Sequence, residues 1–423
     1  MDVTPLCCVT IYILLEIYFY IYVHFFLLPT IVLSRSREMY SGSEAFQVGE
    51  KCINIIKRMK MYNFRDFIKG WFLNAEIESI HTENLHSWLS WILYGCDSED
   101  LSFYEKQKVI SFRLEMCETF DITFKDGFNP DVRHCRFSLE KLTTMHHLLL
   151  EYVLFNIFEC RALFYLIYNG FSRTKTTGGI HVWYKKNEKS SSNRPLLFLH
   201  GICSGWSSYI ECIHKFGKDR DVILIDYSCV RISWIHLHVP DNSEIYDCIN
   251  EIFEKFKIQK VSLLAHSWGT LIATWLLERD PSIFTDITLI DPVGLVIFLP
   301  EPTYILMYKP PTTLLDFAIC YFVRHNINTA NAMYRNLFWC NVTCFLDDIP
   351  KNIPILIGTG TDDDLVSSNA IKDLVNLTNQ NRSIHEFVTL ITFEKYKHGD
   401  ILSKTDSIDK LYEAKRRQMW GIR

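Results

Sequence analysis

Short apolar runs of strand length alternate with helical segments between residues 180 and 392. Segments between the runs, such as WGTLIATWLLER, carry the apolar spacing of an amphipathic or buried helix. Strands that alternate with helices form right-handed βαβ units around a mainly parallel, buried sheet. The sequence therefore predicts an α/β fold. The runs are IHVWYKK from Ile180, PLLFLH at 195–200, DVILID at 221–226, VSLLA at 261–265, ITLID at 287–291, PILIG at 354–358 and FVTLIT at 387–392.

One predicted strand-to-helix junction reads AHSWG at residues 265–269. This is close to the G-x-S-x-G elbow, in which a serine on a sharp turn exposes its hydroxyl at the edge of the sheet. The flanking positions must be small, and Gly269 meets that need, while Ala265 replaces the usual first glycine. Ser267 lies at the head of the following helix, where the positive end of the helix dipole stabilises negative charge. Ser267 is therefore the candidate nucleophile.

A serine hydroxyl needs a general base, and the base needs an acid that orients it. After the last apolar run the chain reads FEKYKHGDIL, which places His398 where the base is expected. The run at 354–358 is followed by TGTDDDLV, and we take Asp363 as the acid because it lies three residues after Gly360 and three before Val366. The alternative acids are Asp364, Asp362 and, at the end of the preceding strand, Asp291.

The tetrahedral intermediate of acyl transfer needs hydrogen-bond donors for its oxyanion. One expected donor is the backbone N–H of Trp268, directly after the nucleophile. The loop after the run 195–200 supplies the other, and we take the N–H of Ile202, with Cys203 as its neighbour. Gly201 lets this backbone approach closely. His200 is expected to fix the loop by hydrogen bonds rather than to react.

In order, PLLFLHG, AHSWG, DDDLV and KHGD resemble the motifs of the α/β-hydrolase superfamily over roughly residues 178–411. The stretches HSWLSWILYGCDSEDLS, RFSLEKLTTMHHLLLEYVL and MYRNLFWCNVTCFLDDIP also resemble a membrane-anchored group of these proteins in fungi and other eukaryotic microbes. The resemblance implies a mainly parallel sheet flanked by helices, a helical N-terminal region and serine-hydrolase chemistry. It implies no particular substrate.

Residues 6–33 form an apolar stretch in which only Glu16 is charged, and it exceeds the ~20 residues that span a bilayer as a helix. We expect a retained transmembrane anchor; a cleaved signal sequence or a buried core helix are the alternatives. Positive charge follows the stretch, which favours a cytoplasmic hydrolase domain. A second apolar stretch, 146–171, contains three charges, so an amphipathic helix on the protein or in the membrane interface is favoured over a second span.

The chain is expected to divide into five parts. The anchor at 6–33 is followed by a helical region at 40–170 and by the first part of the hydrolase core at 178–292. An apolar, aromatic insertion at 293–349 falls between two strands, where an insertion covers the ligand crevice, so a lid is predicted. The core resumes at 350–423. The basic run at 415–417 is expected to be a solvated helix end.

The function that unites these features is hydrolysis of an ester by an acyl-enzyme route. Serine at the elbow, rather than aspartate, argues against epoxide hydrolysis and dehalogenation. An apolar lid beside an anchor favours a lipid or other acyl-ester substrate at a membrane. The alternatives are an acyltransferase with the same triad and an inactive membrane scaffold. We expect no cofactor or metal, and a net charge of −5 gives no reason to expect a nucleic-acid partner.

Overall fold

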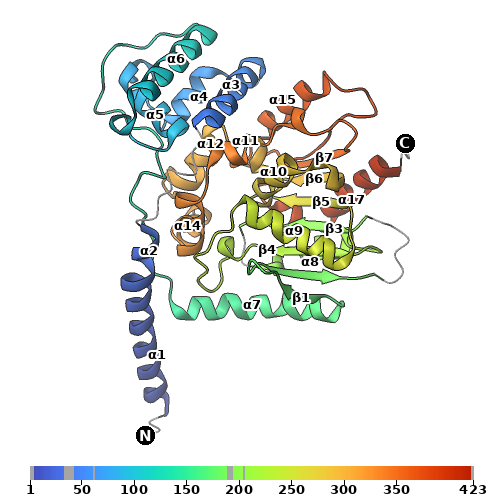
Figure 1. The fold of residues 1–423 in the computed structure, drawn as a ribbon. Coiled ribbons are helices and arrows are strands. Elements are labelled where there is room, and N and C mark those ends of the chain that lie inside the picture. The colour runs from blue at the N-terminus through green and yellow to red at the C-terminus, as the bar shows by residue number, and fades with distance from the viewer. Residues whose placement is uncertain (1–3, 33–41, 61, 188–193, 203–204, 421–423) are drawn as a thin grey trace.

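The computed structural model describes residues 4–32, 42–60, 62–187, 194–202 and 205–420. At its centre is an eight-stranded sheet in the order β1-β2-β4-β3-β5-β6-β7-β8 (Figure 1). β2 is antiparallel to its neighbours β1 and β4, and the other pairs are parallel. The strands are β1 (Ser172–Lys175), β2 (His181–Lys185), β3 (Leu196–Leu199), β4 (Val222–Asp226), β5 (Val261–His266), β6 (Phe284–Ile290), β7 (Ile355–Gly360) and β8 (Thr389–Phe393). The predicted α/β-hydrolase fold is confirmed.

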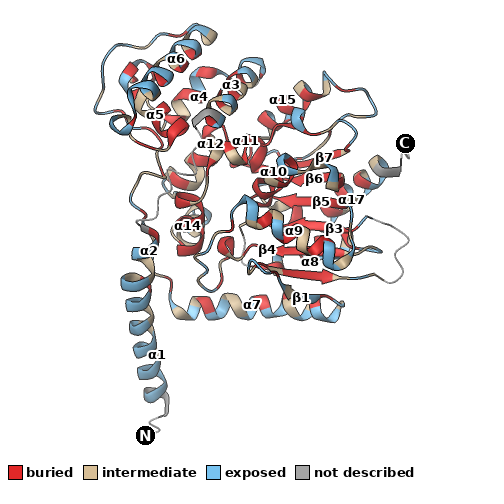
Figure 2. Cartoon of the chain, in the orientation of Figure 1, coloured by how far each residue is buried: buried red, intermediate tan, exposed pale blue. Residues whose placement is uncertain are grey.

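Helices cover both faces of this sheet. As a consequence, β3, β4, β5 and β7 are buried along their whole length (Figure 2). Strands that are apolar on both sides leave no face for water. One face packs against α9 (Asn242–Phe256), α10 (Gly269–Arg279) and α15 (Ser368–Asn379). The other face packs against α7 (Leu149–Tyr168), α8 (Ile210–Phe216), α16 (Asp400–Ser403) and α17 (Thr405–Trp420).

A group of N-terminal helices sits at one end of the molecule (Figure 1). It comprises α3 (Gly42–Arg58), α4 (Phe64–Trp71), α5 (Thr82–Tyr94) and α6 (Phe103–Phe120). Trp71 is central to its core, with ring centroids 6.1 Å from Trp88 and 6.0 Å from Trp91. Offset and edge-on aromatic contacts of this kind add to the burial of apolar area.

The segment predicted to be a lid joins β6 to β7 and is itself helical. Its α-helices are α11 (Val293–Val296), α12 (Pro300–Thr303), α13 (Leu314–Ile319) and α14 (Ile327–Arg335). The N-terminal helices hold this segment in place. The Tyr62 hydroxyl donates to Glu301 at 2.5 Å, and the Trp339 indole N–H donates to the Ile92 carbonyl at 2.7 Å.

A long apolar helix projects from the rest of the molecule (Figure 1). α1 (Thr4–Ile21) continues through the π-helix η1 (Tyr22–Leu27) into α2 (Leu28–Val32). Among the described residues, Cys7–Ile31 is the one helix long and apolar enough to cross a membrane, and little of it is buried. A membrane anchor and a signal sequence share this character. Its far end, α2, packs against α14.

The structure departs from the sequence-based expectations in three local details. The polar strand β1 was not predicted, because SRTK has no apolar alternation and is held by pairing with β2. The sequence SEIYDCINEIFEKF predicts a helix capped by Ser243, but α9 is instead capped by Asp241, whose side chain accepts the Glu244 N–H at 2.9 Å. Lys415, expected to be solvated, is buried, with its ammonium 2.8 Å from Asp286 Oδ1. Arg416 and Arg417 are exposed as expected.

Candidate active site

Ser267 lies on the tight turn between β5 and α10. Its φ of +50° is in the left-handed region that residues other than glycine rarely adopt. The turn is held because the Ser267 N–H donates to the Ile290 carbonyl at 3.0 Å and the Thr270 hydroxyl donates to the Ser267 carbonyl at 2.6 Å. The strained geometry of a nucleophile elbow is therefore present at the predicted serine.

Small residues make this turn possible. A Cβ on Gly269 would collide with the Leu199 carbonyl oxygen, and one on Gly201 would lie 2.8 Å from the Cβ of Ser267. Both positions therefore require glycine. Ala265 lies within the buried strand β5, opposite Leu199 and Leu289 on the two neighbouring strands. Its methyl group is accommodated there, so the missing first glycine of the motif does not distort the elbow.

His398 joins Ser267 to Asp363. Its Nε2 lies 2.8 Å from the Ser267 hydroxyl oxygen, and its Nδ1 lies 2.8 Å from Asp363 Oδ2. When Nδ1 carries the proton donated to the carboxylate, Nε2 is free to accept the serine proton. Ser267 comes from the turn between β5 and α10, His398 from the loop after β8 and Asp363 from the loop after β7. The three residues meet at the carboxyl edge of the sheet.

The surroundings of His398 shift its pKa upward. Burial by itself lowers this pKa, but the hydrogen bond and charge of Asp363, with the charge of Asp291, outweigh burial and raise it above the ordinary 6.5. A nearby carboxylate favours the protonated imidazole in this way.

Only one of the three consecutive carboxylates in the turn after β7 meets the imidazole. Asp362 and Asp364 are exposed, whereas Asp363 is buried. Asp363 Oδ1 accepts the backbone N–H groups of Leu365 and Val366, both at 2.9 Å, so its Oδ2 is turned toward His398. The structure thus brings the expected acid, and neither of its neighbours, to the candidate base.

Asp291, the fourth candidate acid, is buried beside this pair. Its Oδ2 accepts the Gly399 N–H at 2.8 Å and lies 3.7 Å from His266 Nε2. Ligand atoms of Asp291, Asp363 and His398 lie within 4.8 Å of one another, close enough to share a metal ion. His398 is paired with Asp363, however, and Asp291 accepts the Gly399 N–H, and this arrangement suits proton transfer.

Hydrogen bonds also fix the loop expected to supply the second oxyanion donor. Burial lowers the pKa of His200 to about 4, so its ring is neutral. His200 Nε2 accepts the Tyr227 N–H at 2.9 Å, which leaves Nδ1 to donate to the Gly201 carbonyl at 2.8 Å. Ile202 follows, half-buried; its neighbour Cys203 lies outside the described residues. His200 thus has the structural role expected of it.

Two further residues belong to the site and were missed from the sequence. The Gly201 N–H donates to the Tyr209 hydroxyl oxygen at 3.0 Å, and that oxygen lies 3.0 Å from His266 Nδ1. Burial lowers the pKa of His266 although the hydrogen bond and charge of Asp291 oppose it. A polar residue directly before Ser267 was a signal for His266, whereas nothing local marks Tyr209.

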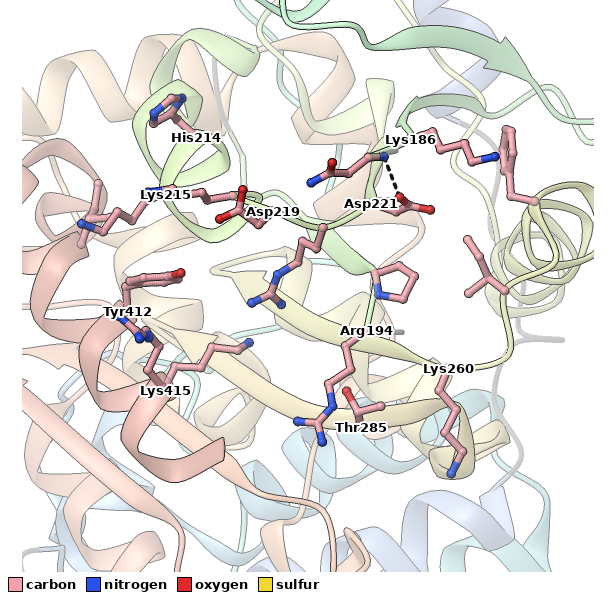
Figure 3. A pocket seen from close by; sticks show the side chains of 18 of the residues that line it. Lys186, Arg194, His214, Lys215, Asp219, Asp221, Lys260, Thr285, Tyr412 and Lys415 are labelled. Atoms are coloured by element: carbon pink, nitrogen blue, oxygen red, sulfur yellow. Dashed lines mark hydrogen bonds between the residues drawn. The ribbon is translucent and has the colours of Figure 1, made fainter. Parts of the chain in front are cut away.

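A cavity of about 1790 Å³ lies away from this site, at the amino ends of the strands (Figure 3). Pro195, Asp221, Lys260 and Thr285 line it near the start of β3, β4, β5 and β6. Basic side chains outnumber acidic ones in its lining, and the lysines, Arg194, Asp219 and Asp221 labelled in Figure 3 are among the lining residues. Because Ser267 follows the opposite end of β5, this cavity is separate from the Ser267–His398 pair.

Comparison with known families agrees with the fold of the sheet. A family model described as alpha/beta hydrolase fold matches residues 194–340, which include Gly201 and Ser267. The chain has the α/β-hydrolase fold. The match ends before Asp363 and His398, so those two positions rest on their local sequence pattern and on the geometry. A search of curated proteins found no match.

Several solved structures are similar to this chain at low identity. A membrane phospholipase A described as a bacterial virulence factor is 14% identical, with 63% of this chain and 94% of that chain covered and a TM-score of 0.44. A Bacillus subtilis carboxylesterase is 10% identical, covering 64% and 99%, with a TM-score of 0.42. A Vigna radiata epoxide hydrolase is 16% identical, covering 60% and 99%, with a TM-score of 0.43. At these values we assign no activity from them.

Proposed function

We propose that this chain is a membrane-anchored serine hydrolase that cleaves an acyl ester through Ser267, His398 and Asp363. The observation that carries the proposal is the pair of 2.8 Å contacts that His398 makes, one with the Ser267 hydroxyl and one with Asp363. A nucleophile, a base and an orienting acid in this order are what acyl transfer by serine needs.

In the proposed reaction, the Ser267 oxygen attacks the ester carbonyl carbon while its proton moves to His398 Nε2. The N–H groups of Trp268 and Ile202 stabilise the resulting oxyanion. The intermediate collapses when the protonated Nε2 gives its proton to the leaving alcohol, which leaves an acyl-enzyme. Water then attacks the acyl carbon, its proton passes through His398, and the acid departs from Ser267.

The membrane part of the proposal is supported by the apolar helix Cys7–Ile31, which leaves most of its surface exposed. Its end, α2, packs against the lid helix α14, so the lid would lie close to the bilayer surface. A substrate carried by the membrane, such as a fatty-acyl ester, suits this placement. A helical region ahead of the core is also what the resemblance to a membrane-anchored group implies.

A fluorophosphonate probe tests this function. We expect covalent labelling of the full-length protein at Ser267, identified by mass spectrometry, and its loss in Ser267→Ala and His398→Ala. Ser282, which lies in a surface turn after α10, gives a matched control, because Ser282→Ala should label like the natural chain. Equal labelling of Ser267→Ala and the natural chain would exclude the proposed nucleophile. Release of free acid rather than a new ester, measured with added alcohol, separates hydrolysis from acyl transfer.

The raised pKa of His398 sets the expected pH dependence. The base must be neutral to accept the serine proton, so kcat/KM should fall as pH drops through this pKa, with a midpoint above pH 6.5. Loss of the Asp363 charge removes the main effect that raises the pKa, so the pKa of the His398 ring should be lower in Asp363→Asn. A pH profile of kcat/KM for the natural chain and an NMR titration of the His398 ring in both proteins measure this. A ring pKa that moves upward in the variant would contradict the assignment.

A further inference from the structure

The helix α7 leaves an apolar face uncovered. Tyr152, Glu159, Ala162 and Leu166 are buried against the protein. The opposite side is exposed, with Phe164 73% and Ile157 61% accessible (Figure 2). Only one of the exposed residues of α7 is charged, and they are Leu150, Val153, Leu154, Ile157, Phe158, Cys160, Arg161, Phe164, Ile167 and Tyr168. A continuous apolar surface of this kind marks an interaction site.

α7 is fixed to α1 at its first turn. Glu16 Oε2 accepts the Leu149 N–H at 2.9 Å, and Glu16 Oε1 lies 2.8 Å from His146 Nε2. A carboxylate at a helix N-terminus is favoured by the helix dipole. The ring of Phe19 also packs edge-on against Tyr152, with centroids 5.4 Å apart. The placement of α1 in a bilayer therefore decides the placement of α7.

The length of α1 beyond the junction and the depth at which an interfacial helix lies agree with one membrane position. From Thr4 to Glu16 α1 extends about 18 Å beyond the junction, at 1.5 Å per residue. An amphipathic helix in the interface is buried roughly 5–10 Å into the boundary between headgroups and acyl chains. The depth of α7 below the near boundary and the ~18 Å that α1 extends beyond it add to about 23–28 Å. This sum is near the ~30 Å thickness of a hydrocarbon core. The position that lets α1 cross the core thus puts α7 at its boundary.

We propose that the exposed face of α7 is a docking surface for a phospholipid bilayer, in which it lies at the headgroup boundary beside α1. The proposal rests on the membrane-anchor part of the proposed function and not on the triad. Arg161 lies among the apolar residues of this face, where its guanidinium can reach lipid phosphates. Trp234, 45% exposed and stacked 6.1 Å from Tyr152, adds an aromatic side chain of the type enriched at membrane interfaces.

Depth-dependent quenching tests this docking surface in full-length protein reconstituted in liposomes of phosphatidylcholine and phosphatidylglycerol. Cys7, Cys8 and Cys160, the exposed thiols among the described cysteines, are first replaced by serine. A bimane label is then attached in Phe164→Cys, and brominated acyl chains are included in the lipid. The matched control is Phe103→Cys, an 80% exposed phenylalanine on α6 at the far end of the molecule (Figure 1).

We expect brominated lipid to lower the emission at position 164 at least twofold and to leave the emission at position 103 unchanged. A label in Leu14→Cys on α1 reports separately on the anchor. Quenching at position 14 without quenching at position 164 would overturn the docking surface alone. The docking surface would also be overturned if protein, and not lipid, shielded the label at position 164 from aqueous iodide. Absence of quenching at both positions would overturn the anchor as well. Fluorophosphonate labelling of Ser267 in the same liposomes reports on the hydrolase proposal independently.

Discussion

Asp363→Asn is expected to lower kcat for ester hydrolysis about 10³–10⁴-fold while leaving the protein folded. The reason lies in how the side chain is held. Asp363 Oδ1 accepts the N–H groups of Leu365 and Val366, so in the variant the amide oxygen takes that position. The amide NH₂ is then turned toward His398 Nδ1 and can only donate. The imidazole must place its proton on Nε2, facing the Ser267 hydroxyl, and it can no longer accept the serine proton.

The matched control is Asp291→Asn, which changes the other buried carboxylate of the cluster. Its amide oxygen can still accept the Gly399 N–H, so we expect a loss of about tenfold or less, since a hydrogen bond to a charged acceptor is weakened rather than removed. Asp362→Asn and Asp364→Asn, both at exposed positions, should leave kcat unchanged. Steady-state kinetics on a soluble ester, with circular dichroism as a check on folding, gives all four values. The reverse ranking of Asp291 and Asp363 would make Asp291 the acid.

The three candidate catalytic residues could be picked out from the sequence because each follows a strand with a recognisable local pattern. The spacing that selected Asp363 has a physical basis in the structure. A carboxylate that accepts the N–H groups two and three residues ahead forms a turn with its own backbone, and Leu365 and Val366 supply those groups. Asp362 and Asp364 cannot use the same two donors, which leaves them in solvent. Local chemistry therefore distinguishes Asp363 from the two adjacent carboxylates without any long-range contact.

The charges that the sequence alone could not place are held by partners far along the chain. In the sequence Glu16 is simply the one charge of an apolar stretch, yet its carboxylate accepts the N–H of Leu149, 133 residues away. Lys415 donates to the Thr288 hydroxyl, 127 residues away. A buried charge is stable only when such partners are present, and apolar periodicity carries no information about them. Tyr209 was missed for a similar reason, because its partner His266 is 57 residues away along the chain.

Glu159 on α7 is the second position where a large effect is expected. Its side chain is 4% exposed, and its Oε1 accepts the Trp206 N–H at 3.0 Å and lies 3.0 Å from an Arg231 nitrogen. Oε2 faces the Ser207 N–H at 3.4 Å. The carboxylate therefore ties α7 to the segment that follows the candidate oxyanion loop. Any movement of α7 on a bilayer would be transmitted to that segment through this side chain.

Glu159→Ala is expected to lower the free energy of unfolding by about 2–4 kcal/mol, because it leaves two backbone N–H groups without their acceptor. Arg231 keeps both of its 2.9 Å contacts with Asp226, so its charge stays compensated. Burial raises the pKa of Glu159, although Arg231 and the two N–H groups oppose this, so the charged form is already costly in place. Glu159→Gln retains an acceptor without that charge and should therefore cost about 1 kcal/mol or less.

The matched control for Glu159 is Glu151→Ala, eight residues earlier on the same helix. Glu151 is 26% exposed, and it accepts the Tyr321 hydroxyl at 3.0 Å, so its loss should cost about 1 kcal/mol or less. Urea unfolding of the three variants in one detergent, followed by tryptophan fluorescence, compares them directly. Equal losses for Glu159→Ala and Glu151→Ala would show that the buried acceptor adds nothing. A loss in Glu159→Gln as large as in Glu159→Ala would mean that the charge, and not the hydrogen bonds, joins α7 to the active-site loop.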